Sequence, residues 1–170
     1  QESVNGEQRL IPNEVFSRTF FPGRTARSPN PVVFERNKKP GTFRIFVFGE
    51  SAALGDPRPG FGMPRYLQVL LNNRFPETEF EVICTAMTAI NSHVILPIAR
   101  ECADLDGDLW IVYMGNNEMV GPFGATGVLG SQAPPLFWIR SYVFASHLRL
   151  FQLVQLAWER ASASSEHSQE

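Results

Sequence analysis

Three short apolar runs constrain the fold of this chain more than any other feature. Each has the length and apolar content of a buried strand. The runs cover residues 43–48, 80–84 and 109–114. Apolar side chains at helical spacings lie between and after these runs and predict helices over residues 64–75, 89–104 and 136–160. The order strand, helix, strand, helix, strand, helix is typical of a doubly wound α/β fold with right-handed crossovers.

The third run, residues 109–114, is apolar on both faces, which is typical of strands in the middle of a parallel sheet. We therefore predict an α/β fold with a doubly wound parallel sheet, a flavodoxin-like three-layer sandwich that is incomplete at about three strands. No further run can cover the far side of this strand, so we expect an open apolar sheet edge. Such an edge indicates a fragment of a longer polypeptide, or a subunit that pairs with a partner chain or with itself.

Composition divides the chain into three regions. Residues 1–41 are rich in Pro, Gly, Arg and Asn and predict an extended N-terminal arm. Residues 42–160 form the partial α/β domain, and residues 161–170 a polar tail or linker. Three aromatic side chains of the arm are expected to dock on the domain: Phe16, Phe20 and Phe21. Since no apolar run follows Gln1, the sequence predicts neither a signal peptide nor an anchor.

The composition also excludes several classes of protein. Apolar residues make up 44% of the chain, enough for a packed core, and the net charge of −2 argues against a nucleic-acid partner. Two cysteines are too few for a disulfide framework. No uncharged apolar stretch has the length of a membrane span. Between Leu136 and Trp158 the only charges are Arg140 and Arg149, which favours a buried helix, with contact to a membrane surface as the alternative.

Small and polar residues follow each predicted strand, at the sheet end where ligands bind. The three segments are Gly49-Glu50-Ser51, Thr85-Ala86-Met87-Thr88 and Gly115-Asn116-Asn117-Glu118. A serine at a strand-to-loop turn beside fixed hydrogen-bond donors fits acyl transfer. We predict Ser51 as the nucleophile, with the Asn117 amide and the backbone N–H groups of Ser51 and Ala86 as oxyanion donors. Three neighbours are expected to have auxiliary roles: Gly49, Glu50 and Gly115.

These blocks, in their order, spacing and strand context, resemble the SGNH hydrolases, also called GDSL hydrolases, over residues 43–123. The resemblance implies ester hydrolysis with Ser51 as the nucleophile and Ala86 and Asn117 in the oxyanion hole. The longer string over residues 43–124 resembles a bacterial subgroup that often joins this domain to helical repeats and a membrane anchor. The subgroup resemblance implies an extracytoplasmic or membrane-associated location, with the chain close to a membrane.

The chain departs from the family pattern at several positions. Glu50 and Glu118 replace aspartates, and Ala86 replaces a glycine while it keeps a backbone donor. The largest departure is an absence, since residues 118–170 contain no Asp-x-x-His block, which carries the family's base histidine. The resemblance therefore covers the N-terminal half of the domain. Because a serine without a base is a poor nucleophile, this chain alone is expected to turn over little substrate.

Each predicted site residue also has an interpretation without catalysis. Ser51 has the alternative of capping the next segment, and Asn117 that of a turn residue. For Ala86 the alternative is close packing. These alternatives stay open at the level of the sequence.

Other titratable residues offer weaker candidates. His93, at the start of a predicted helix, is the auxiliary candidate for the base, ahead of His147 in the last helix and His167 in the tail. Glu50 and Glu118 have no ligand-spaced histidine beside them, so we expect no metal, and we expect no cofactor.

Two hypotheses of different class follow. In the first, the full protein is an esterase-type hydrolase that acts on a small-molecule, glycan or lipid ester, with its histidine outside this chain. In the second, the chain is a catalytically silent SGNH-like subunit that uses the open sheet edge or the last helix for assembly. An Asp-x-x-His block downstream in the gene would favour the first hypothesis, and a stop codon after Glu170 the second. The resemblance does not specify the substrate.

Overall fold

The computed structural model describes residues 2–4, 7–21, 25–125, 134–146 and 148–166. The chain forms two compact units, residues 1–133 and residues 134–170. The first unit contains the predicted sheet and the predicted site residues, and the second contains two helices.

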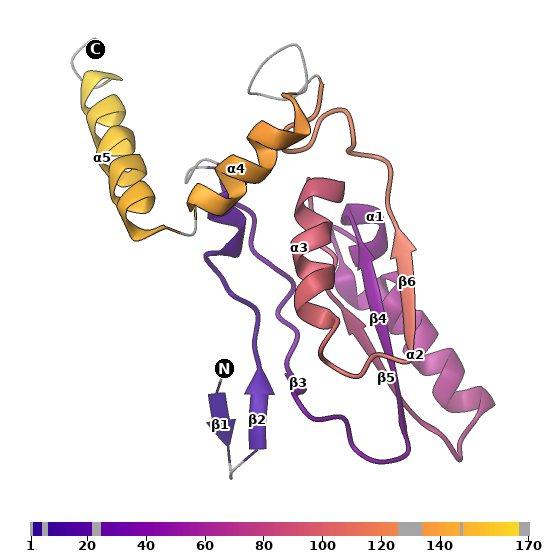
Figure 1. Cartoon of the computed structure of the whole chain (residues 1–170). Coiled ribbons are helices and arrows are strands. Elements are labelled where there is room, and N and C mark those ends of the chain that lie inside the picture. The colour runs from indigo at the N-terminus through magenta and orange to yellow at the C-terminus, as the bar shows by residue number, and fades with distance from the viewer. Residues whose placement is uncertain (1, 5–6, 22–24, 126–133, 147, 167–170) are drawn as a thin grey trace. The chain divides into compact units, whose positions relative to one another are not determined.

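The main sheet consists of β4 (Thr42–Gly49), β5 (Glu79–Cys84) and β6 (Leu109–Tyr113). All pairing is parallel, and the spatial order is β5-β4-β6 (Figure 1). In the register of the sheet, Phe46 of β4 lies opposite Ile83 on one side and Trp110 on the other. The predicted α/β fold with an incomplete parallel sheet is confirmed.

Helices connect the strands on both faces of the sheet. From β4 the chain passes through α1 (Ser51–Leu54), the short 3-10 helix η3 (Pro59–Phe61) and α2 (Met63–Arg74) to β5. It returns through α3 (Ser92–Cys102) to β6, on the opposite edge of the sheet. Because the two crossovers run in opposite directions and right-handed crossovers are the rule, the helices lie on opposite faces. Figure 1 shows α2 and α3 on the two sides of the strands.

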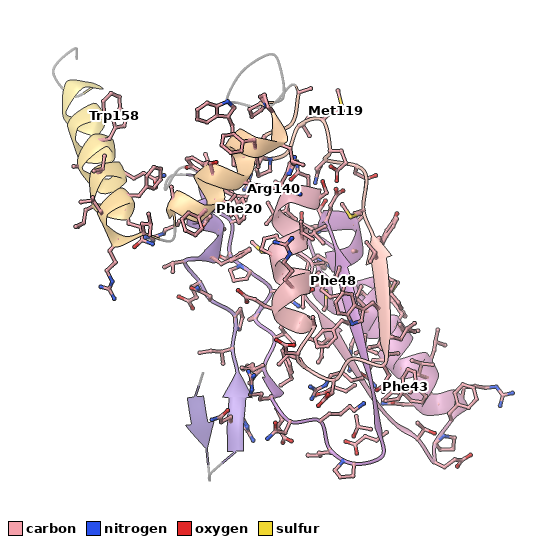
Figure 2. All side chains as sticks on the ribbon, in the orientation of Figure 1. Phe20, Phe43, Phe48, Met119, Arg140 and Trp158 are labelled. Atoms are coloured by element: carbon pink, nitrogen blue, oxygen red, sulfur yellow. The ribbon has the colours of Figure 1, made fainter. Side chains whose placement is uncertain are left out.

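The middle position belongs to β4, whose residues from Arg44 to Gly49 are all buried. The buried Phe46 and Phe48 stack at 6.1 Å between ring centroids, and Phe48 (Figure 2) also meets the partly exposed Trp110 at 4.9 Å. The expected open edge is present at the run over residues 109–114, because among the described residues β6 pairs with β4 alone. Its apolar character on both faces is that of a covered strand, although it is not covered here.

A buried arginine ties the strand β4 to the N-terminal segment. The Arg44 side chain, 1% exposed, donates to the Glu81 carboxylate at 2.7 Å and to the carbonyl oxygens of Leu105 and Glu35, each at 2.8 Å. The guanidinium also lies over the Phe34 ring, 5.4 Å from its centroid. A buried guanidinium is tolerated where its N–H groups have hydrogen-bond acceptors, and the side chain of Arg44 has such acceptors.

The N-terminal segment is more structured than the extended arm that we expected. Its strands β1 (Glu2–Val4), β2 (Glu7–Leu10) and β3 (Phe34–Glu35) form a small antiparallel sheet, and η1 (Phe16–Thr19) is a 3-10 helix. These strands are too short and too polar to show an alternation of apolar and polar residues, so the sequence did not predict them. Of the three aromatic side chains expected to dock, Phe20 is buried. Phe16 lies 5.4 Å from Phe20, and both Phe16 and Phe21 are half-buried.

The second unit contains α4 (Leu136–Ser146) and α5 (Arg149–Glu166), so the prediction of one helix over residues 136–160 is wrong. The Ser146 hydroxyl donates to the Val143 carbonyl, and the Gln152 amide donates to the Ser146 carbonyl, which caps the end of α4. Residues 161–166, expected in the tail, belong to α5. No helix in the described part of the chain combines the length and the hydropathy of a membrane span.

Candidate functional site

The ends of β4 and β6 approach each other closely at Gly49, two residues before Ser51. Gly49 lies opposite Tyr113 in the register, and its carbonyl accepts the Met87 N–H at 3.2 Å. A Cβ at Gly49 would collide with the Tyr113 carbonyl oxygen and with the Cβ of Ala53. Glycine is therefore required where the chain turns from β4 toward Ser51.

Glu50 is the structural centre of the site. Its side chain is fully buried, and its carboxylate accepts three backbone N–H groups, those of Gly115 at 3.2 Å, Asn116 at 2.9 Å and Asn117 at 3.2 Å. Gly115 has a φ of +133°, a conformation that L side chains rarely adopt. The carboxylate thus holds the loop after β6 against the turn after β4. Glu50 was expected only in an auxiliary role, and its function here is to position this loop.

Ser51 is the first residue of α1, directly after Glu50, and it is half-buried. Its carbonyl accepts the N–H groups of Gly55 and Asp56. Its hydroxyl has no hydrogen bond with any residue that the structure describes, and Glu50, not Ser51, occupies the cap position of α1. The capping alternative therefore has no hydrogen bond to support it, and the hydroxyl is uncommitted.

Asn117 is half-buried and its side chain is partly engaged. The Nδ2 amide donates to the Ile90 carbonyl at 3.2 Å, which uses one of its two hydrogens. The neighbouring Glu118 carboxylate accepts both the Ser92 N–H at 2.9 Å and the Ser92 hydroxyl at 2.7 Å. The loop after β6 is thereby joined to the start of α3 as well as to Glu50.

Ala86 is fully buried and packs with three residues of a small apolar cluster: Ala53, Leu54 and Cys84. Burial raises the pKa of the Cys84 thiol, and a hydrogen bond from the Ala86 backbone N–H lowers it by less. This arrangement agrees with the close-packing alternative for Ala86.

No base is paired with Ser51 among the described residues. His93, the second residue of α3, presents its ring edge to Phe123 at 5.9 Å between centroids, and it has no hydrogen bond to Ser51. His147 and His167 lie outside the described residues. The part of the chain that the structure describes also contains no group of acidic, histidine or cysteine side chains that could hold a metal ion.

Sequence reasoning missed Asn91, the fully buried residue before α3. Its Nδ2 donates to the Pro122 carbonyl at 2.9 Å, while its Oδ1 has no partner among the described residues. Ala89, two residues before Asn91, and Phe123, which follows its partner Pro122, have positive φ values of 59° and 62°, a strained conformation for these residue types. An asparagine before a predicted helix normally indicates a cap, but Asn91 makes no side-chain cap bond.

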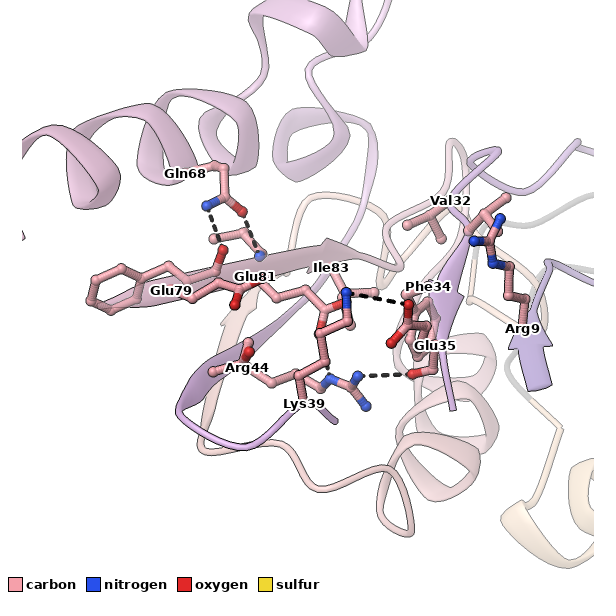
Figure 3. A pocket seen from close by; sticks show the side chains of 14 residues that line it. Arg9, Val32, Phe34, Glu35, Lys39, Arg44, Gln68, Glu79, Glu81 and Ile83 are labelled. Carbon is pink, nitrogen blue, oxygen red and sulfur yellow. Dashed lines mark hydrogen bonds and ion pairs between the residues drawn. The ribbon is translucent and has the colours of Figure 1, made fainter. Parts of the chain in front are cut away.

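A cavity of about 440 Å³ lies elsewhere, between β5 and the N-terminal segment (Figure 3). Its lining includes Arg9, Glu35, Lys39 and Arg44. None of the predicted catalytic residues lines it. The cavity therefore adds nothing to the candidate site.

Comparisons with known proteins do not decide the family. No family model, no curated protein and no solved structure matches the chain.

Proposed function

We propose that this chain carries the nucleophile and the oxyanion loop of an SGNH/GDSL-like ester hydrolase. The observation that carries the proposal is the contact of Glu50 with three N–H groups of the loop at residues 115–117. Glu50 is adjacent to Ser51, so this contact joins the loop that carries Asn117 to the turn that carries a serine whose hydroxyl is uncommitted.

In the proposed reaction, the Ser51 oxygen attacks the acyl carbon of an ester and its proton passes to a histidine outside this chain. The resulting oxyanion accepts the second Asn117 amide hydrogen and the Ser51 backbone N–H, which as part of the first helical turn has no intrahelical acceptor. The alcohol leaves with the proton from the histidine. Water, deprotonated by the same base, then attacks the acyl-enzyme. The acyl–oxygen bond breaks, the acid leaves, and the base returns the proton to the Ser51 oxygen.

Fluorophosphonate labelling in the presence of imidazole tests the proposal. Imidazole supplies the missing base, takes the Ser51 proton as the phosphorus–oxygen bond forms, and fluoride leaves. We expect a labelling rate at Ser51 that rises with imidazole concentration, and no adduct in Ser51→Ala. Peptide mapping by mass spectrometry locates the adduct. A folded wild-type chain that stays unlabelled at Ser51 at every imidazole concentration would overturn the proposal.

The second candidate is a catalytically silent assembly subunit. It is favoured by the surroundings of two predicted oxyanion residues, since the Asn117 amide bonds to the Ile90 carbonyl and Ala86 is fully buried. The same experiment separates the two candidates, because a silent subunit gives no adduct at Ser51 even with imidazole.

A further inference from the structure

Asn91 connects the start of α3 to the loop after β6. Its carbonyl accepts the N–H groups of Val94 and Ile95, each at 3.0 Å, so its backbone caps α3, which packs on β4. Its side chain is fully buried and is directed to the loop, where Nδ2 donates to the Pro122 carbonyl at 2.9 Å. The backbone of this residue is therefore fixed by the helix, and its side chain is bonded to the loop.

Contacts lead from Asn91 to Asn117, the predicted oxyanion residue, and back again. The Gly121 N–H donates to the Asn117 carbonyl at 2.7 Å. Gly121 also lies against the Asn91 side chain, since a Cβ at this glycine would meet the Cβ and Cγ of Asn91 at 3.0 Å. The Asn117 amide in turn donates at 3.2 Å to the carbonyl of Ile90, the residue before Asn91. Both the main chain and the side chain of Asn117 are thus held by contacts that involve Asn91 or its neighbour.

A distant carboxylate leaves the Asn91 side chain free for this contact. Glu118 accepts the Ser92 N–H at 2.9 Å and the Ser92 hydroxyl at 2.7 Å, so it satisfies one of the N–H groups at the start of α3. An asparagine before a helix usually accepts such an N–H group with its own side chain, but Asn91 makes no side-chain cap bond. Glu118 therefore takes the capping role, and the Asn91 amide bonds the loop instead.

Unfavourable features accompany the hydrogen bond between Asn91 and Pro122. The strained residues Ala89 and Phe123 lie close to its two ends in the sequence, and such conformations persist only where the surrounding contacts fix them. The Asn91 Oδ1 is buried without a partner among the described residues, which lowers the stability of the fold. Local departures of this kind are typical of a functional site.

We propose that Asn91 is a positioning residue that directs the Asn117 amide toward the oxyanion. The inference rests on the proposed function, in which the second amide hydrogen of Asn117 stabilises the oxyanion. Because the amide group is planar, the bond of one hydrogen to the Ile90 carbonyl determines the direction of the other. An oxyanion donor is effective only when it is fixed before the charge develops. Loss of Asn91 should therefore slow the reaction and leave the binding of the reactant unchanged.

The kinetics of fluorophosphonate labelling at a fixed imidazole concentration test the inference. The dependence of the labelling rate on probe concentration separates the maximal rate constant from the binding constant of the probe. We expect the maximal rate constant to fall about 100-fold in Asn117→Ala, the loss typical of one oxyanion donor, and about tenfold or more in Asn91→Ala. The binding constant should stay the same in both variants. Asn73→Ala, at an exposed position of α2, is the matched control and should be labelled at the wild-type rate.

A double-mutant cycle shows whether Asn91 acts through Asn117. In the Asn117→Ala background, Asn91→Ala should cause no further loss, because the amide that Asn91 directs is already absent. Losses that multiply in the double variant, or a folded Asn91→Ala that is labelled at the wild-type rate, would contradict the inference. If circular dichroism shows Asn91→Ala unfolded, Gly121→Ala replaces it, since its methyl group would press on both Asn91 and the Asn117 carbonyl and should lower the same rate constant.

Nuclear magnetic resonance separates a failure of this inference from a failure of the proposed function. The side-chain amide resonances of Asn117 are assigned by their loss in Asn117→Ala. We expect them to shift in Asn91→Ala, because the bond to the Ile90 carbonyl changes, and to keep their positions in Asn73→Ala. A wild type without an adduct combined with this shift would mean that the proposed function alone fails. Unchanged Asn117 amide resonances in both Asn91→Ala and Gly121→Ala would mean that Asn91 does not position this amide, whatever the labelling shows.

Discussion

The strands β5 and β6 both form edges of one sheet, but the chain stabilises them in different ways. β5 bonds to β4 on its inner side and to the amides of Gln68 and Asn30 on its outer side. In the part of the chain that the structure describes, β6 bonds to β4 alone and is anchored at its two ends, by Asp108 before it and by Glu50 in contact with the loop after it. A capped edge such as that of β5 therefore needs no neighbouring strand. The outer backbone groups and both faces of β6 remain available to such a strand.

The anchor at the end of β6 should have the largest effect when it is removed. Glu50→Ala leaves three N–H groups of the loop at residues 115–117 without their acceptor, so we expect a loss of about 3 kcal/mol or more in the free energy of unfolding. Urea denaturation measures this loss. Hydrogen exchange should accelerate in residues 115–117, while β5 keeps its protection.

Ser51→Ala is the matched control for Glu50→Ala. It alters the adjacent residue, whose hydroxyl has no hydrogen bond with the described residues, and we expect it to change the stability by less than about 0.5 kcal/mol. Equal stabilities for the two variants would mean that Glu50 does not anchor the loop.

The core of the fold could be predicted because β4 and β5 combine apolar runs with turn residues, and periodic helical segments separate them. The open edge at β6 could be predicted as well, because no further apolar run is left to cover the far side of this strand. The break between α4 and α5 could not be predicted, since apolar residues continue through it and local caps at Ser146 end the helix.

The candidate site was predicted less completely than the fold. Ser51 and Asn117 could be selected because residues after parallel strands gather at one sheet edge. The role of Glu50 could not be predicted, because its partners are backbone groups that lie 65 to 67 positions away in the sequence. The role of Arg44 could not be predicted for the same reason, since most of its hydrogen-bond acceptors are backbone carbonyls. Hydrogen bonds from side chain to distant backbone leave no periodic pattern.

Removal of the cap on β5 should have an intermediate effect. Gln68→Ala leaves the Phe80 carbonyl and the Val82 N–H without partners at a half-buried edge, and we expect a loss of about 2 kcal/mol in the free energy of unfolding. The Val82 amide should exchange faster with solvent. Asn73→Ala, a change at a neighbouring exposed position of α2, should have almost no effect. Unchanged exchange at Val82 would show that the two edges do not differ as described.

The anchor at the start of β6 should have the smallest effect, and one that depends on pH. Hydrogen bonds from the Lys38 ammonium and from the Arg44 backbone N–H lower the pKa of Asp108 below its ordinary value. A folded-state pKa below the unfolded one contributes stability above the unfolded pKa of about 3.9, and this contribution is lost as the pH falls through the folded pKa. Asp108 is largely exposed to solvent, so its contribution is screened.

Asp108→Asn should therefore lower the free energy of unfolding by about 0.5 kcal/mol at pH 7, and the difference from the wild type should shrink below about pH 4. Urea midpoints at pH 7, 5, 4 and 3 measure it. Asp104→Asn, at an exposed carboxylate without a hydrogen bond among the described residues, should give no difference at pH 7. If the Asp108→Asn difference were constant down to pH 3, the carboxylate charge would not be what anchors the start of β6.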